Sequence, residues 1–164
     1  MIFENTNGKK FTFNQMVNEV IKWTGEYHDS NFTYVVATDS QVHKVRRKAI
    51  WYTTYITLVW VHRESKGGRL FIIKDKVDGK IEMVKRLMRE TELSIALMTE
   101  ISESRLKDRI DDFSVHIDVG RCGKSKSVVE SCLGWVLGMG WNAEIKPEAI
   151  GAYCCADRFS KGNN

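Results

Sequence analysis

Two aspartates follow apolar, β-branched segments and could supply metal-ligating carboxylates. Asp39 comes after the run Phe32–Ala37, in a turn-prone Thr-Asp-Ser cluster, and Asp118 lies near the end of Phe113–Val119. Ligands of open α/β sheets bind beside the carboxyl ends of strands. If these two strands are neighbours, the carboxylates converge, and a cation such as Mg²⁺, which prefers oxygen ligands, relieves their repulsion. The alternative is that each aspartate caps a turn or a helix.

The hydrophobic pattern predicts the elements that carry these aspartates. An amphipathic helix over Phe11 to about Trp23 precedes the first strand, and the strands Ile50–His62 and Arg69–Val77, joined at Lys66-Gly67-Gly68, complete an antiparallel meander. The later elements are a long helix from Lys80 to about Lys107, the strand Phe113–Val119, a helix Ser127–Leu137, a strand Trp141–Lys146 and a helical segment Ala149–Phe159. This order predicts a mixed α/β sheet covered by helices.

Composition limits the class of protein. The 164 residues are 43% hydrophobic, which fits one domain of ordinary globular type, residues 1–164. The formal net charge of +4 permits an anionic partner without requiring one. No apolar run approaches the ~18 residues that span a bilayer, and the N-terminus resembles no signal peptide, so we expect a cytoplasmic protein without a membrane partner. The four cysteines lack zinc-ligand spacing.

Basic residues cluster beside both aspartates. One group lies in the connector Lys44–Lys48 and the other in the loop after Asp118, at a predicted helix N-terminus where backbone N–H groups can bind phosphate. The candidate nucleic-acid contacts are Lys44, Arg46, Arg47, Arg121, Lys124 and Lys126. The alternatives are an ordinary charged hairpin tip and a solvated loop. The loop is no P-loop, because only Arg121 and Cys122 separate its glycines.

The sequence offers little for nucleophilic catalysis by a side chain. It contains no G-x-S-x-G motif, and no cysteine and histidine form a convincing pair. His116 shares a strand face with Asp118, so it is either a further metal ligand or, as is more common for a single strand histidine, a structural residue.

Four short motifs occur in chain order: Thr38-Asp39-Ser40-Gln41 after the first strand, Glu90-Thr91-Glu92-Leu93 on the long helix, His116-Ile117-Asp118 in the fourth strand and Ala156-Asp157-Arg158-Phe159 on the last helix. Together they resemble the ribonuclease H-like superfamily and within it a bacterial branch often called YkuK-like. The resemblance covers about residues 31–161. It implies a mixed five-stranded sheet, a three-strand antiparallel meander plus two parallel strands, flanked by helices, with the N-terminal helix as an addition.

The resemblance also implies a metal site. In the superfamily, four carboxylates hold two Mg²⁺ or Mn²⁺ ions, and here they correspond to Asp39, a helix glutamate, Asp118 and Asp157. Glu90 and Glu92 flank the apolar helix face on opposite shoulders. The family places the glutamate just before a core position, which favours Glu90. Glu92 is the fallback, because its pattern needs the charged Glu100 at a core position.

The expected function is that of an enzyme, a divalent-metal-dependent nuclease acting on RNA, DNA or an RNA/DNA hybrid. Two ions can lower the pKa of the attacking water and stabilise the leaving oxygen. The alternative is a ribonuclease H-like module without catalysis that binds nucleic acid or another protein. Whether the four acids share one site distinguishes these possibilities, because a binding module has little reason to gather negative charge where phosphates lie.

Overall fold

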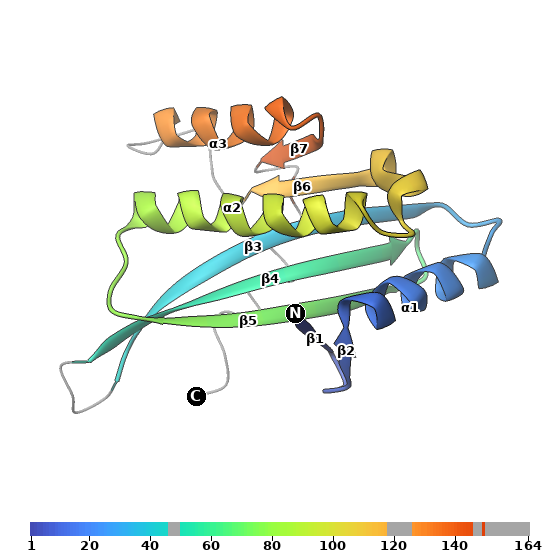
Figure 1. The fold of residues 1–164 in the computed structure, drawn as a ribbon, viewed down its shortest axis with the longest axis horizontal. Coiled ribbons are helices and arrows are strands. Elements are labelled where there is room, and N and C mark those ends of the chain that lie inside the picture. Colours follow the sequence, from blue (N-terminus) through green and yellow to red (C-terminus); the bar gives the residue numbers. More distant parts are fainter. Residues whose placement is uncertain (46–49, 118–125, 146–148, 150–164) are drawn as a thin grey trace.

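A mixed sheet forms the centre of the molecule (Figure 1). The structure is a computed structural model and describes residues 1–45, 50–117, 126–145 and 149. In chain order its elements are β1 (Ile2–Asn5), β2 (Lys10–Thr12), α1 (Phe13–Glu26), β3 (Phe32–Lys44), β4 (Trp51–Arg63), β5 (Gly68–Asp78), α2 (Met83–Ser102), a 3-10 helix η1 (Lys107–Asp112), β6 (Phe113–Ile117), α3 (Lys126–Gly138) and β7 (Asn142–Ile145).

The strand order within these described residues is β2-β1-β5-β4-β3-β6-β7. Strands β3, β4 and β5 form the antiparallel meander, and β3 pairs with β4 along its whole length. Strand β6 lies parallel to β3, and β7 lies parallel to β6. The predicted mixed sheet, a three-strand meander plus two parallel strands, is therefore confirmed, and β1 and β2 extend it beyond the edge of β5.

The N-terminal hairpin β1–β2 is a feature that the sequence analysis missed. Phe11 was expected in the first helix but lies in β2, where it is buried together with Phe3 of β1. Helix α1 begins only at Phe13, because Thr12 caps it: the Thr12 hydroxyl accepts from the Gln15 N–H at 3.3 Å, and Gln15 Oε1 accepts from the Thr12 N–H at 2.8 Å.

Strand β3 is longer than expected, which corrects the position of Asp39. The turn-prone Thr-Asp-Ser cluster was expected to end the strand after Ala37, yet the strand continues to Lys44. The reason is that β4 offers a partner to every residue of β3, up to the pair Lys44–Trp51. Asp39 therefore lies within a strand and not at its tip.

The long helix is shorter than expected. It was predicted from Lys80 to about Lys107, whereas α2 spans Met83–Ser102 and the separate helix η1 follows it. Within the part of the chain that is described, no helix has the length and apolarity needed to cross a membrane. The predicted final helix Ala149–Phe159 lies outside the described residues apart from Ala149, which is buried.

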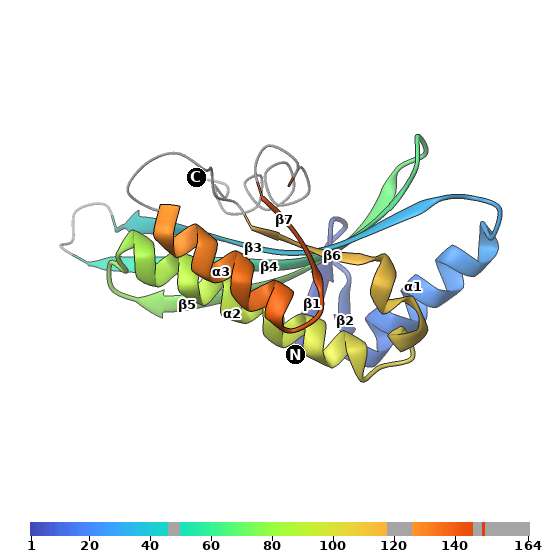
Figure 2. The same ribbon diagram turned by 90° about the horizontal axis from the view of Figure 1, so that it is seen from above.

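Helices α1, α2 and α3 pack against one face of the sheet, which we call the α2 face (Figure 2). Tyr34 and Val36 of β3 and Val115 of β6 join the core there. The other face, which we call the far face, carries a second cluster that includes Val35 and Ala37 of β3. Successive side chains of β3 thus alternate between the two faces.

Candidate carboxylate site

The register between β3 and β6 aligns the two strands that carry the predicted aspartates. Thr38 pairs with Ile117 in the last parallel pair that the structure describes, and Asp39 is the next residue of β3. Asp118 follows Ile117 in the sequence and lies outside the described residues. The two strands are neighbours, as the metal-site hypothesis requires. Within the described chain, Asp39 itself pairs with Ile56 of β4.

Helix α2 turns Glu90 toward β3. The Glu90 side chain is buried, and its Oε1 accepts a hydrogen bond from Ser40 Oγ at 2.5 Å. Arg86, one turn earlier on α2, donates through Nη1 to the Ser40 carbonyl at 2.8 Å and to Ser40 Oγ at 3.1 Å. Ser40 therefore connects a cation and an anion of the same helix to β3.

Burial and the charge of Glu90 both raise the pKa values of two neighbouring groups, Tyr55 and Cys132. Tyr55, the cross-strand partner of Ser40, is 3% exposed. Burial raises the pKa of Tyr55, the Glu90 carboxylate raises it further, and the guanidinium groups of Arg86 and Arg89 oppose the rise. Burial also raises the pKa of Cys132 on α3, where Glu90 adds a smaller contribution. Tyr55 and Cys132 therefore stay protonated and neutral beside the carboxylate at neutral pH.

A second polar contact between α2 and β3 lies one helical turn further along. Thr38 Oγ1 is 2.8 Å from Ser94 Oγ and donates to Thr57 Oγ1 of β4 at 3.1 Å. All three residues are buried. Hydrogen-bonded polar pairs inside an apolar layer fix the position of a helix, because sliding it would leave buried hydroxyl groups unpaired. This contact helps to hold Glu90 at the level of Ser40.

Glu92, the fallback for the helix position, points elsewhere. Its Oε2 lies 2.7 Å from Nη1 of Arg89, and both side chains are about half exposed. A half-exposed pair three residues apart on a helix belongs to the solvated surface. Glu90 is the glutamate that α2 presents to β3.

Asp39 and Glu90 approach β3 from opposite faces at adjacent residues. Ser40 faces α2, so strand alternation directs the side chain of Asp39 to the far face, like that of Ala37. Both carboxylates lie just past the last described pair of β3 with β6. Their hard oxygen donors match what Mg²⁺ and Mn²⁺ prefer.

The structure brings two of the four predicted ligands to this level of β3. Asp118 and Asp157 lie outside the described residues. Among the described residues, no three His, Cys, Asp or Glu side chains cluster closely enough to hold a metal ion. The site is therefore built here from Asp39, Glu90 and the residues that hold them.

His116 has structural partners on the far face. Its Nε2 lies 2.9 Å from Ser114 Oγ and 3.1 Å from Glu144 Oε2 of β7, with which His116 pairs. Burial lowers the pKa of His116 to about 4, so the ring is neutral at pH 7. Its Nδ1 is buried and has no hydrogen-bond partner in the described part of the chain.

Three residues of this region were not singled out from the sequence: Ser40, Arg86 and Glu144. Arg86 lies four residues before Glu90, a spacing that puts both on one helix side and could have indicated it. Ser40 and Glu144 become visible only through strand pairing, because their partners are distant in the chain.

The predicted nucleic-acid contacts are only partly within the described chain. Lys44 ends β3, and its Nζ lies 5.3 Å from the centre of the Trp51 ring. Lys126 is the first residue of α3. The remaining predicted contacts lie outside the described residues: Arg46, Arg47, Arg121 and Lys124.

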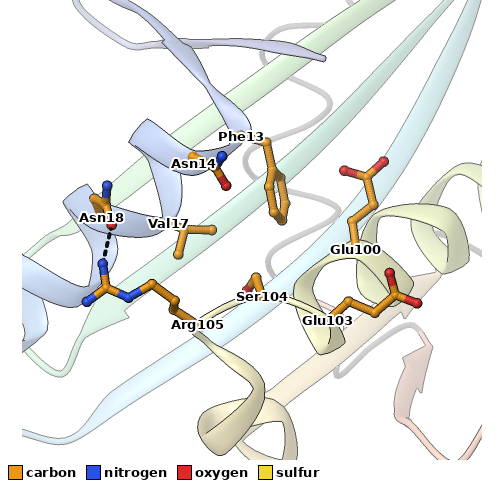
Figure 3. A pocket seen from close by; sticks show the side chains of 8 residues that line it. All are labelled: Phe13, Asn14, Val17, Asn18, Glu100, Glu103, Ser104 and Arg105. Carbon is orange, nitrogen blue, oxygen red and sulfur yellow. Dashed lines mark hydrogen bonds between the residues drawn. The ribbon is translucent and has the colours of Figure 1, made fainter.

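A pocket of about 590 Å³ lies between α1 and the end of α2, away from the carboxylates (Figure 3). Glu100 and Glu103 stand on its α2 side, and Arg105 donates to Asn18 Oδ1 at 2.9 Å. Glu100 follows Glu90 by ten residues, which is ~15 Å along a helix. The pocket is therefore separate from the carboxylate site.

Comparison with known proteins agrees with this architecture. A family model described as ribonuclease H-like matches residues 15–161. A protein of Bacillus subtilis (strain 168), named as uncharacterized protein YkuK, is 27% identical over 173 residues, which cover 98% of this chain and 97% of that relative. No solved structure matches the chain significantly. With the family model matching nearly its whole length, and the sheet containing the antiparallel meander and the two parallel strands that were predicted, the chain belongs to the ribonuclease H-like family.

Proposed function

We propose that this chain is a divalent-metal-dependent nuclease that hydrolyses phosphodiester bonds in RNA, DNA or an RNA/DNA hybrid. The observation that carries the proposal is the buried Glu90 carboxylate, held by Ser40 beside Asp39. Burying a carboxylate costs free energy unless hydrogen bonds compensate for it, and here Ser40 donates one. Buried charges of this kind cluster at functional sites.

Two Mg²⁺ or Mn²⁺ ions would be held by Asp39, Glu90, Asp118 and Asp157. When bound, such ions lower the pKa of an attacking water and stabilise the leaving 3′-oxygen. Neighbouring side chains would orient the metal ligands. Ser40 holds the Glu90 carboxylate through its hydroxyl group, and Arg86 holds Ser40. Such supporting hydrogen bonds keep a metal ligand in one orientation and so reduce the entropy that is lost when the metal binds.

The basic residues beside the two aspartate-bearing strands would contact the phosphate backbone. They are Lys44, Arg46, Arg47, Arg121, Lys124 and Lys126. Contacts of this type position a nucleic acid without reading its sequence, and they make its affinity depend on salt.

The test is a titration of Mg²⁺ and Mn²⁺ into the wild type and the double variant Asp39→Asn/Asp118→Asn. Metal at ten times its Kd should add ~1.4 kcal/mol of stability, a rise in Tm of ~3–6 °C. Labelled RNA, DNA and hybrid then report cleavage. We expect the stabilisation and the cleavage to disappear together in the variant.

The matched control is Asp108→Asn/Asp111→Asn, which removes two exposed carboxylates from η1. It should keep both responses. A wild type that binds nucleic acid in a salt-dependent way but cuts none of the three substrates at any metal concentration contradicts the nuclease and supports the module without catalysis.

A further inference from the structure

Beyond Asp39 the meander continues as a three-stranded segment that we call the extension. It comprises residues 40–44 of β3, 51–55 of β4 and 74–78 of β5, together with Lys80. The three strands stay paired here, whereas the described pairs of β3 with β6 end at Thr38. Figure 1 shows β3 and β4 continuing past the end of β6.

Aromatic rings and lysines are stacked on both faces of the extension. On the far face, the rings of His43 and Tyr52 are parallel within 16° with centres 4.8 Å apart, and Lys76 Nζ lies 4.1 Å from the Tyr52 centre. On the α2 face, the Nζ atoms of Lys44 and Lys80 lie 5.3 and 5.2 Å from the Trp51 centre.

The far-face stack lies on the same sheet face as Asp39. Side chains alternate along β3, so Asp39, Gln41 and His43 point the same way, and Tyr52 is the cross-strand partner of His43. His43 comes four residues after Asp39, which is ~13 Å along the strand at ~3.3 Å per residue. That distance corresponds to about four stacked nucleotides at ~3.4 Å each.

The charge of the extension suits a polyanion. It contains four lysines and two aspartates, a net charge of +2 within a chain of net charge +4. Lys74, Lys76 and Lys80 are exposed. A flexible lysine that covers a ring in the free protein can move to a phosphate and leave the ring face to a base.

Lysines combined with aromatic rings favour single strands over duplexes. Bases of a single strand are free to stack on protein rings, whereas bases in a duplex already stack on one another. From these observations we infer that the extension binds single-stranded nucleic acid, with a base on the His43–Tyr52 pair, and directs the strand toward Asp39. Its phosphates would contact Lys74 and Lys76, which lie on the far face because Lys74 pairs with Ile56 of the far-face cluster. Only the delivery of the strand to Asp39 rests on the proposed nuclease function.

Binding is measured by fluorescence anisotropy in EDTA, so that no metal-dependent cleavage interferes. The probes are a labelled 20-nucleotide DNA, the same sequence as RNA, and the duplex of the DNA. We expect at least one of the single strands to bind about fivefold or more tightly than the duplex. Equal or tighter binding of the duplex overturns the inference.

Charge variants locate the binding surface. Lys74→Gln/Lys76→Gln should make the dependence of log K on log salt shallower by about 1.4, because each lost phosphate contact with a single strand contributes ~0.7. The control Lys9→Gln/Lys10→Gln removes two lysines from the region of β2, including Lys9, whose Nζ lies 4.9 Å from the Phe11 ring centre. The inference is wrong if both variants change the slope equally.

Ring variants test the stacking. Tyr52→Leu keeps an apolar strand side chain and should weaken single-strand binding at least about fivefold, the lower end for one lost base stack. The control is Tyr27→Leu, because Tyr27 also lies under a cation, with Arg63 3.8 Å from its centre, but is remote from the extension. Equal loss in both variants overturns the inference.

Failure of this inference is distinguishable from failure of the nuclease. If the extension variants weaken single-strand binding but the protein cleaves nothing, the proposed nuclease function is wrong and the proposed binding surface stands. If the protein cleaves with metal, but Lys74→Gln/Lys76→Gln binds a single strand as tightly as wild type, the proposed binding surface is wrong and the proposed nuclease function stands.

Discussion

Ser40 of β3 donates a hydrogen bond to the buried carboxylate of Glu90, a residue 50 positions later on α2. The same serine accepts from Arg86 through its hydroxyl and carbonyl oxygens. This contact joins the helix to the strand at the residue that follows Asp39. The carboxylates of Asp39 and Glu90 therefore lie on opposite sides of β3.

Replacing Ser40 by alanine should weaken the fold. The Ser40→Ala variant loses the donor to a buried carboxylate and one acceptor of Arg86, so we expect the free energy of unfolding to fall by ~1–3 kcal/mol. Urea unfolding measures it. Thr33→Ala, an exposed position on the same strand, should cost less than ~1 kcal/mol. Equal losses at the two positions contradict a buried Ser40–Glu90 contact that stabilises the fold.

The two helix glutamates should differ in catalysis. Glu90→Gln should lower metal-dependent cleavage by ~100-fold or more, since a lost carboxylate ligand weakens a metal that contributes several kcal/mol to the transition state. Glu92→Gln removes only a half-exposed partner of Arg89 and should leave the rate within about threefold. Single-turnover cleavage measures both. A loss confined to Glu92→Gln assigns the ligand to Glu92 instead.

Stability without metal should fall as the pH drops from about 6.5 to about 4. The unfolded chain protonates His116 near its ordinary pKa of 6.5, whereas burial lowers the pKa of the folded ring to about 4. The unfolded state therefore binds more protons in this interval. We expect a loss of ~1–3 kcal/mol, because each pKa unit is worth ~1.36 kcal/mol and the Glu144 carboxylate offsets part of it.

Urea unfolding in EDTA at several pH values measures this dependence. His116→Gln should remove the His116 part of the slope between pH 4 and 6.5. His28→Gln, at a side chain that is 78% exposed, should keep the wild-type slope. An unchanged slope in His116→Gln excludes His116 as its source.

Two glycines should respond to alanine with opposite signs. A Cβ on Gly68 would lie 2.8 Å from the Val61 carbonyl oxygen and 2.9 Å from Trp60 Nε1, so Gly68→Ala should cost ~1–3 kcal/mol. Gly134 lies within α3 with no atom within 4 Å of its added Cβ, so Gly134→Ala should add ~0.5–1 kcal/mol. Thermal unfolding of the two variants checks both signs; stabilisation by Gly68→Ala contradicts the close approach.

The sheet was predictable from sequence because its long strands are rich in β-branched and aromatic residues. The strands that became β4 and β5 were placed within one residue of their observed bounds. The end of β3 was misplaced, because local turn propensity at Thr38-Asp39-Ser40 is outweighed by pairing with β4. Propensity is local, whereas a ladder partner is supplied by a distant segment.

The candidate site was predictable in type more than in detail. Helix spacing left Glu90 and Glu92 open, and the pattern of the family that the sequence resembles favoured Glu90, the glutamate that the structure turns toward β3. Ser40 and Arg86 could not be recognised from the sequence as the residues that hold it, because their contacts depend on how α2 lies across β3. The hairpin β1–β2 was not predicted, because strands of three and four residues are too short to show a hydrophobic periodicity in the sequence.

The metal site built on Asp39 is tested by the rate of Mn²⁺-dependent cleavage of labelled RNA, DNA and hybrid by wild type and by Asp39→Asn, under single-turnover conditions. Asp108→Asn, which removes an exposed carboxylate from η1, is the control. We expect the rate to fall by ~100-fold or more in Asp39→Asn and to stay near that of wild type in Asp108→Asn. Cleavage by folded Asp39→Asn at the wild-type rate would contradict a metal site built on Asp39.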